Sequence, residues 1–469
     1  MPKGFAKSHN GKMELSDYPV EREMSENNIL SIRKRILAMI VPITSENLLQ
    51  MIAGTVTMAF MGRLDAAAVG AVGIGNIIFR MAWAIFRGIG IGASAAISRY
   101  YGSKDASRMY RLIVEGIAAV LLLSLVVQQI VFRFGKYLIT FLSSGGGLLE
   151  DALMFTGIIS YSIPLMALVV FSAGVFQGMT NSKTPMYAVG IMNGINIIFS
   201  YLLIFGNFGL PRLGIKGAGY AYNIAQLSAA IFSIIMLLRT IRKIKPKDSK
   251  GFTFSGYSIR ELIRYGFPSA MEILLWQVSS VVLTKAVLTY GETAYASYQL
   301  GLQAESISYM PAAGFSIAAT AFIGQHLGAN DFKQSRTYMS ELRKMVVVIT
   351  LVMGSILVFI PGIVMRLLTT DQSMIAIGST YLIVMGVSQL PQNLAGLYNG
   401  ALRGAGYPNV PMFTTILGIW FIRIPLVLIL AYFVKAELHW IWIAMALDLF
   451  SRYLFSRTAF KRNVEKKYE

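Results

Sequence analysis

The chain has 469 residues, of which 55% are hydrophobic and only 14% are charged. Soluble domains carry roughly a quarter charged residues, so this composition excludes a water-soluble protein. The formal net charge of +19 would suggest nucleic acid as the partner of a soluble protein. In a membrane protein it indicates basic cytoplasmic loops instead, and we expect no nucleic-acid partner.

The sequence also argues against metal or thiol chemistry. It has no cysteine, and its three histidines, His9, His326 and His439, are far apart along the chain. It contains neither an H-E-x-x-H element nor a glycine loop followed by Lys-Ser or Lys-Thr for phosphate binding. We therefore expect no cofactor, no metal, no enzymatic activity and no ATP-driven pumping.

The first 30 residues are polar and mixed in charge, which predicts a solvated tail. The first apolar run starts late and is long, so we expect no cleavable signal peptide. The apolar blocks that follow have the length that a helix needs to cross the hydrocarbon core. They predict transmembrane helices at 35–62, 70–98, 113–134, 152–177, 185–207, 217–239, 265–290, 294–326, 343–369, 376–402, 411–434 and 440–460.

Basic residues alternate from loop to loop, as the positive-inside rule requires. The longest and most basic loop lies in the middle of the chain, at 240–264, and its segment "SIRELIR" predicts a surface helix. Both termini are expected on the cytoplasmic side, which requires an even number of spans. Twelve spans satisfy this condition.

The two halves of the chain repeat one another at a constant offset. A shift of 226 positions (268 − 42) places Pro42 on Pro268, Glu46 on Glu272 and "GVFQGMTNSKTPM" at 174–186 on "GALRGAGYPNVPM". Parallel repeats of six spans are typical of transporters in which two bundles flank a central cavity. The predicted fold is an all-α membrane protein with twelve transmembrane helices in two pseudo-symmetric six-helix bundles.

The predicted organisation follows from this repeat. It comprises a polar N-terminal tail (1–30), an N-terminal lobe (31–239), a basic cytoplasmic linker (240–264), a C-terminal lobe (265–460) and a basic tail (461–469).

Small and acidic residues recur where the second helix of each repeat ends. Gly102 and Gly328 are interpreted as helix C-caps. Asp105 and Asp331 follow them and are expected to cap the next helix.

Several of these segments resemble a known family. "GRLDAAAVGAVGIGN", "GIGIGASAAISRYYGSKD", "GMTNSKTPM" and "GALRGAGYPNVPM" are similar to the signature segments of multidrug and toxic compound extrusion (MATE) transporters. "SENLLQ" and "MEILLW" resemble a bacterial branch with a Glu in both helix 1 and helix 7. The resemblance implies a monomeric antiporter in the plasma membrane of a prokaryote, which exports amphipathic, often cationic organic compounds in exchange for H⁺ or Na⁺.

Two positions depart from the family pattern. Many relatives carry an Asp in helix 1 where this chain has Thr57, and others carry an acid in helix 10 where it has Gln392. These departures make Glu46 and Glu272 the candidates for coupling-ion binding.

Glu46 and Glu272 lie well inside their apolar runs, at a depth of roughly 12–16 Å at 1.5 Å rise per residue. An ionisable side chain at the centre of a membrane helix costs about 2.5–3.5 kcal/mol and usually marks an ion or substrate path. A carboxyl that gains a proton on one side and loses it on the other suits a proton-coupled cycle. The alternative is a structural Glu beside backbone disrupted by Pro42 or Pro268.

The other polar residues of the predicted helices are candidates for the cavity wall. Arg80 and Arg87 are seven positions apart and hence on one face of a helix. The pairings to test are Arg80 or Arg87 with Glu46, and Lys285 with Glu272 or Glu305. For these intramembrane charges we expect salt bridges within a lobe, and cations so deep in the membrane are also compatible with an anionic substrate. The candidates for the cavity and substrate site are Arg80, Arg87, Asn193, Asn196, Trp276, Lys285, Gln299, Gln303, Glu305, Gln392 and Asn393.

A second function is compatible with the same sequence. Flippases for lipid-linked saccharides or peptidoglycan precursors, in the wider superfamily, share two-lobed, helix-rich architecture. Twelve spans and the paired Glu favour the antiporter, whereas the intramembrane cations Arg80, Arg87 and Lys285 favour the flippase.

Overall fold

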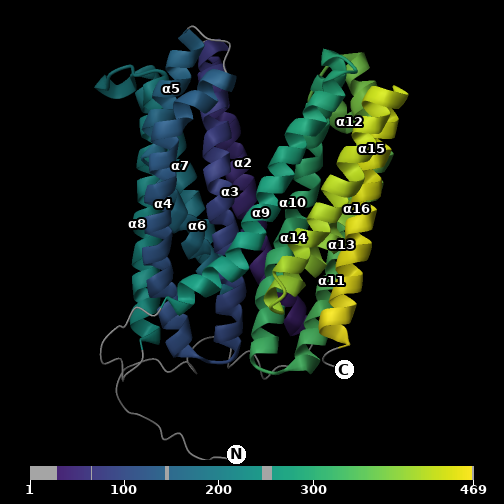
Figure 1. Cartoon of the computed structure of the whole chain (residues 1–469). Coiled ribbons are helices and arrows are strands. Elements are labelled where there is room, and N and C mark those ends of the chain that lie inside the picture. Colours follow the sequence, from purple (N-terminus) through teal and green to yellow (C-terminus); the bar gives the residue numbers. More distant parts are fainter. Residues whose placement is uncertain (1–28, 65, 143–146, 246–255, 467–469) are drawn as a thin grey trace, which may run out of the picture.

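The computed structural model describes residues 29–64, 66–142, 147–245 and 256–466. Its regular structure is helical throughout these ranges, and the helices form two bundles side by side (Figure 1). The N-lobe contains α2 (Ile29–Gly62), α3 (Ala66–Gly102), α4 (Ala106–Leu142), α5 (Gly147–Ser160), α6 (Ile163–Gly178), α7 (Lys183–Phe205) and α8 (Ile215–Ile244). The C-lobe contains α9 (Tyr257–Leu288), α10 (Glu292–Gly328), α11 (Phe332–Phe359), α12 (Pro361–Arg366), α13 (Gln372–Gly404), α14 (Asn409–Thr415), α15 (Ile424–Leu428) and α16 (Leu438–Phe460).

Twelve membrane spans account for these helices. In the described residues, ten spans are long and apolar enough to cross a bilayer, the segment Asn409–Val434 counting as one, and α5 with α6 forms an eleventh that bends by 52°. The twelfth is α16, which packs beside α13 along the height of the C-lobe (Figure 1). Asp448 and Arg452 lower the hydropathy of α16. The predicted all-α membrane fold with two six-helix bundles is confirmed.

Some boundaries differ from the prediction. The segment "SIRELIR" forms no separate surface helix, because it is the start of the continuous helix α9. Leu262 of this segment and Tyr265 just after it are buried against α3, α4 and α6, so the amphipathic pattern reflects packing on the N-lobe. The N-terminal tail and the centre of the predicted linker lie outside the described residues.

Equivalent glycines show the repeat in three dimensions. A Cβ on Gly174 would lie 2.0 Å from the carbonyl oxygen of Gly90, and a Cβ on Gly400 would lie 2.1 Å from that of Ser316. Both residues of the second contact are 226 positions beyond those of the first (400 − 174 and 316 − 90). Only glycine allows helices α3 and α6, or α10 and α13, to approach so closely.

The turns that follow α3 and α10 correct one prediction. The residues with left-handed backbone are Lys104 (φ 56°) and Asn330 (φ 58°), and not Gly102 or Gly328. Asp105 and the equivalent Asp331 do cap the next helices, since each accepts a hydrogen bond from a backbone N–H three residues on, at 3.0 Å.

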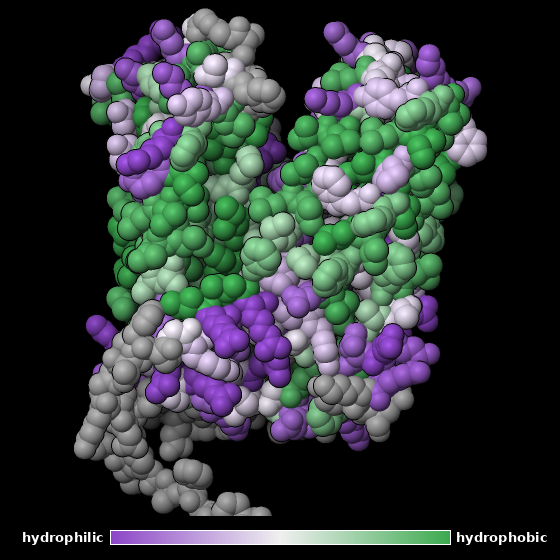
Figure 2. Space-filling view, in the orientation of Figure 1, coloured by the Kyte–Doolittle hydropathy of each residue, from purple (hydrophilic) through white to green (hydrophobic). Residues whose placement is uncertain are grey.

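Gly102 and Gly328 are needed for contact between the lobes instead. A Cβ on Gly102 would lie 1.9 Å from the carbonyl oxygen of Gln325, and a Cβ on Gly328 would lie 2.2 Å from that of Arg99. Helices α3 and α10 therefore cross at these two glycines. The crossing lies at the end of the molecule where α2 begins and α16 ends, which we call the basic end because hydrophilic residues, many of them Lys and Arg, gather there (Figure 2).

The first helix of each lobe reinforces this junction by crossing to the other lobe. Ile36 and Met39 of α2 are buried in a cluster with α10, α11 and α13, just as the start of α9 is buried against the N-lobe. Polar contacts add to the packing: the Ser98 hydroxyl donates to the Thr320 carbonyl oxygen at 3.3 Å. The lobes are joined at the basic end and separated by a cleft at the opposite, open end (Figure 2).

The Gly102 crossing yields a first prediction. Gly102→Ala should penalise the closed basic end by about 1–3 kcal/mol, since a rigid backbone carbonyl occupies the space of the new methyl group. Because the chain has no cysteine, a single Ser94→Cys reporter can measure labelling by an impermeant maleimide added from the basic side. Labelling from that side should increase about 5- to 150-fold.

Gly73→Ala is the matched control, because Gly73 lies on the same helix and no atom lies within 4 Å of its Cβ position. It should leave labelling from the basic side unchanged. Equal labelling of the two variants would contradict the role of the glycine crossing in closing this end.

Candidate substrate and ion site

The structure has two adjoining cavities. The N-lobe cavity has a volume of about 470 Å³ and is lined mainly by α2, α3, α6, α7 and α8, with Phe155 of α5 and Gln277 of α9. The central cavity, of about 620 Å³, lies between the lobes, with walls from α2, α3 and α6 on one side and α10 and α13 on the other. Asn47, Gln50 and Arg87 line both, so the two cavities meet along α2 and α3.

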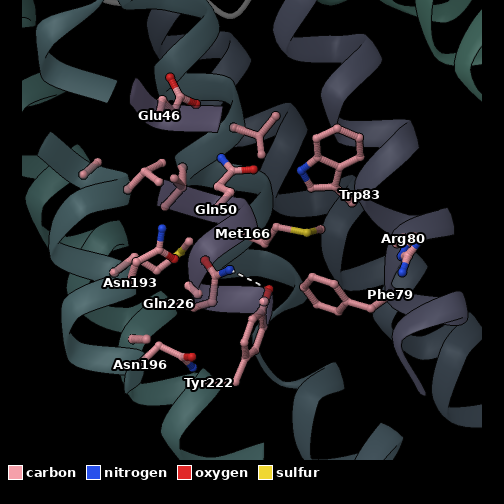
Figure 3. Close-up of a pocket in the computed structure, with 18 of the residues that line it drawn as sticks. Glu46, Gln50, Phe79, Arg80, Trp83, Met166, Asn193, Asn196, Tyr222 and Gln226 are labelled. Carbon is pink, nitrogen blue, oxygen red and sulfur yellow. Dashed lines mark hydrogen bonds between the residues drawn. The ribbon is translucent and has the colours of Figure 1, made fainter. Parts of the chain in front are cut away.

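Glu46 lies in the wall of the N-lobe cavity (Figure 3). Its side chain is only 6% exposed, and its Oε2 atom has no hydrogen-bond partner among the described residues. The guanidinium of Arg87 is the charge that acts on it, although no ion pair within 4 Å joins the two in the described chain. Glu46 is therefore a buried acid whose charge is only partly compensated.

Glu272 has a different environment, although it occupies the equivalent position of the repeat. Its Oε2 accepts from the guanidinium of Arg403 at 2.5 Å, and its Oε1 lies 3.4 Å from the hydroxyl of Thr415. It lines neither cavity. The difference arises because Arg403 in the C-lobe corresponds to Gln177 in the N-lobe (403 − 177 is 226), so only one acid finds a cation in the equivalent place.

The predicted cavity residues fall into three groups. Arg80, Arg87, Asn193 and Asn196 line the N-lobe cavity, and Gln392, Asn393 and again Arg87 line the central cavity. Trp276, Lys285, Gln299 and Gln303 are exposed and line neither of these two cavities. Glu305 is buried and accepts a hydrogen bond from the Tyr381 hydroxyl at 2.5 Å.

Predicted charge pairs are only partly reproduced. Arg87 acts on Glu46, but Arg80 is exposed and Lys285 pairs with neither Glu272 nor Glu305 among the described contacts. The cation near Glu305 is Arg423. Arg423 also contacts Asp448 at 2.8 Å, so the expected salt bridges within a lobe are confirmed for this pair.

Polar residues of the N-lobe cavity satisfy one another in part. The Thr57 hydroxyl donates to the side-chain oxygen of Asn196 at 3.1 Å. The amide of Gln226 donates to the Tyr222 hydroxyl at 2.8 Å (Figure 3). The Asn193 amide nitrogen lacks a partner in the described chain. The N-lobe cavity thus contains amide and hydroxyl oxygens in addition to the Glu46 carboxylate, and oxygen ligands suit a proton or a hard cation.

Sequence reasoning missed several residues of the central cavity. Arg403, Gln177 and Ser94 all line it, and none was among the predicted site residues. The repeat contained a signal for Arg403 and Gln177, because a shift of 226 positions aligns these two residues near a glycine-rich helix end. A charge present in only one copy of a repeat indicates a local specialisation.

The sequence model of the MatE family matches this chain over residues 42–202 and 268–429, one match in each half. The chain belongs to the MatE family. These two ranges begin at Pro42 and Pro268, four residues before the two glutamates.

Curated relatives of this MatE chain extend over nearly its whole length. A probable multidrug resistance protein NorM of Thermotoga maritima is 27% identical over 436 residues, which cover 92% of each chain. The probable multidrug resistance protein YoeA of Bacillus subtilis is 25% identical over 96% of this chain and 98% of its own.

Solved structures share the fold. A MOP superfamily transporter from Pyrococcus furiosus, described as having a binding pocket of reverse polarity, superimposes with a TM-score of 0.86 at 18% identity, covering 93% of this chain and 97% of that one. A multidrug resistance MATE family transporter in an outward-facing conformation gives a TM-score of 0.85 at 18% identity, over 92% and 96% of the two chains.

Proposed function

We propose that this MatE protein is a secondary active efflux antiporter, which exports amphipathic organic compounds in exchange for H⁺ or Na⁺. The observation that carries the proposal is Glu46, a buried acid in the wall of the N-lobe cavity, which adjoins the cavity between the lobes. An ionisable residue inside the membrane is a functional site by default. The names of the curated relatives, probable multidrug resistance proteins, support drug-like cargo.

The distribution of charge supports a direction of transport. By the positive-inside rule, the basic end faces the cytoplasm, together with the start of α2 and the end of α16. The cleft then opens to the outside, and α3 and α10 close it at the cytoplasmic end. Export requires this crossing to separate while the lobes approach each other at the open end, in the manner of two rocking bundles.

Glu46 can couple export of the organic compound to entry of H⁺ or Na⁺, because the cargo and the ion compete for its carboxylate. In its ionised form it attracts an organic cation, which aromatic residues of the same cavity such as Trp83 and Phe79 can also hold. A proton or Na⁺ that arrives from the open side neutralises the carboxylate and weakens the hold on the cation. The cargo is then released outside, and the neutral site can return to face the cytoplasm.

The test is transport by the purified protein in proteoliposomes. Ethidium, an amphipathic organic cation, is supplied on the side of the basic end, with an imposed pH gradient, an imposed Na⁺ gradient or neither. We expect accumulation against the ethidium gradient with one of the two ion gradients and none without them. Ethidium movement that needs neither gradient would overturn antiport and favour the flippase alternative.

A further inference from the structure

The deep end of the central cavity is rich in unpaired hydrogen-bond donors. The Arg403 Nε, the Gln177 amide nitrogen and the Ser94 hydroxyl have no hydrogen-bond partner in the described chain, and all three residues line the cavity. Arg403 is 8% exposed, and Gln177 and Ser94 are each 3% exposed. Buried polar groups without partners are costly, so these donors need water or a ligand.

The repeat places these donors near the axis between the lobes. Gln177 and Arg403 are equivalent residues, and so are Ser94 and Thr320 (320 − 94 is 226). The Thr320 hydroxyl donates to the carbonyl oxygen of Gly400 at 2.9 Å, but the Ser94 hydroxyl has no such acceptor in the described residues. The unpaired donors therefore arise where the two lobes differ, and they are not repeated in both lobes.

The charged side chains that line the central cavity are both cationic. Arg87 and Arg403 both line it, and no Asp or Glu is among the described residues of its wall. Glu272 occupies one guanidinium nitrogen of Arg403, Nη2, which leaves Nε unpaired. Glu46 lies in the wall of the adjoining N-lobe cavity. An organic cation fits poorly here, whereas an oxyanion can accept from guanidinium, amide and hydroxyl donors together.

We propose that the deep end of the central cavity is an oxyanion subsite, formed by Ser94, Gln177, Arg403 and Arg87. The inference rests on the proposed transport function and specifies its substrate class. The cargo includes amphipathic compounds with a carboxylate, sulfonate or phosphate, among them zwitterions whose cationic group lies toward Glu46. The methionines and isoleucines of the same wall, such as Met51, Ile91 and Met310, contact the apolar part of the cargo.

Matched probes can test the subsite. A rhodamine dye with a free carboxylate and its methyl ester differ only in the oxyanion. Their equilibrium binding is measured by fluorescence anisotropy with the full-length protein in phosphatidylcholine nanodiscs. Arg87→Gln should weaken binding of the acid about tenfold or more, and Gln177→Leu or Ser94→Ala about threefold to tenfold, the size of one lost hydrogen bond.

Binding of the methyl ester should change little in Gln177→Leu and Ser94→Ala. These two variants also keep the test decisive if a substitution at Arg403 prevents folding. Arg133→Gln removes the same charge from an exposed position on α4 and should leave binding of both dyes unchanged.

The outcomes separate this inference from the transport proposal. Equal changes in affinity for acid and ester would overturn the oxyanion subsite, even if gradient-driven ethidium export persists. A selective loss of the acid without any gradient-driven transport would support the subsite and overturn antiport. Nanodiscs with added phosphatidylglycerol test whether a lipid phosphate is the oxyanion that binds. If the lipid competes with the carboxylate dye in the wild-type protein, and competes less in Gln177→Leu, the subsite is supported with lipid as its occupant.

Discussion

Replacing Asp448 with Asn should destabilise the C-lobe more than any other single change considered for this protein. Asp448 is fully buried and lies between two arginines, with Arg423 at 2.8 Å and Arg452 at 3.0 Å. Removing one partner of a buried ion pair costs about 3–5 kcal/mol, because the remaining charge has no compensation. Here two guanidinium groups would lose their acid at once.

The surroundings of Asp448 leave no simple route for relaxation. The contacts with both arginines are close but lack aligned hydrogen bonds to the carboxylate oxygens, so charge attraction holds the cluster together. A Cβ on Gly418 would lie 2.2 Å from Asp448 Oδ1. Gly418 belongs to a π-helical stretch, Ile416–Arg423, and such stretches are often found at functional sites.

Thermal unfolding of the detergent-solubilised protein, followed by tryptophan fluorescence, measures the effect. We expect a lower unfolding temperature for Asp448→Asn than for Glu437→Gln, which removes an acid from the exposed start of the same helix. The triple variant Asp448→Asn, Arg423→Gln, Arg452→Gln should recover part of the loss. An unfolding temperature equal to that of Glu437→Gln would show that the cluster contributes nothing to stability.

The architecture could be predicted from the sequence because membrane helices and repeats leave strong local signals. The length of an apolar block reports a span, and a constant offset over Pro42, Glu46 and their partners reports a duplication without knowledge of any contact. The boundaries of the two lobes assigned from the sequence stay predictions, since the linker's centre lies outside the described residues.

The functions of single residues were harder to predict, because they depend on the opposite lobe. Gly102 was interpreted as a C-cap. Only the structure shows that α10 approaches so closely that the carbonyl oxygen of Gln325 occupies the space of a side chain at this position. The start of α9 was interpreted as a surface helix for a similar reason. Its buried side, with Leu262, packs on the N-lobe, and helical periodicity does not distinguish a protein partner from a lipid surface.

The paired glutamates show the same limit most clearly. The repeat predicted equal candidates at Glu46 and Glu272, but the structure distinguishes them through a residue more than a hundred positions away. Arg403 neutralises Glu272, whereas its counterpart Gln177 leaves Glu46 without an equivalent cation. An internal repeat predicts where a site lies, and the positions that differ between its copies decide which copy acts.

Glu46→Gln should abolish the coupling of substrate export to the ion gradient. Glutamine keeps the size of the side chain but removes the charge for which the coupling ion and an organic cation compete. Coupling between two ligands typically amounts to about 1–3 kcal/mol, or 5- to 150-fold in affinity. Ethidium affinity of the variant should therefore stop depending on the coupling ion, and uphill accumulation should fall to the level without a gradient.

Glu272→Gln is the sharpest comparison, since it makes the same change at the equivalent position. Its main effect should be lower thermal stability, because Arg403 loses its ion-pair partner, and adding Arg403→Gln should restore stability. No second substitution should restore coupling to Glu46→Gln. If Glu46→Gln still accumulates ethidium in response to the gradient while Glu272→Gln does not, the coupling acid is the one held by Arg403, and that ion pair must open in each transport cycle.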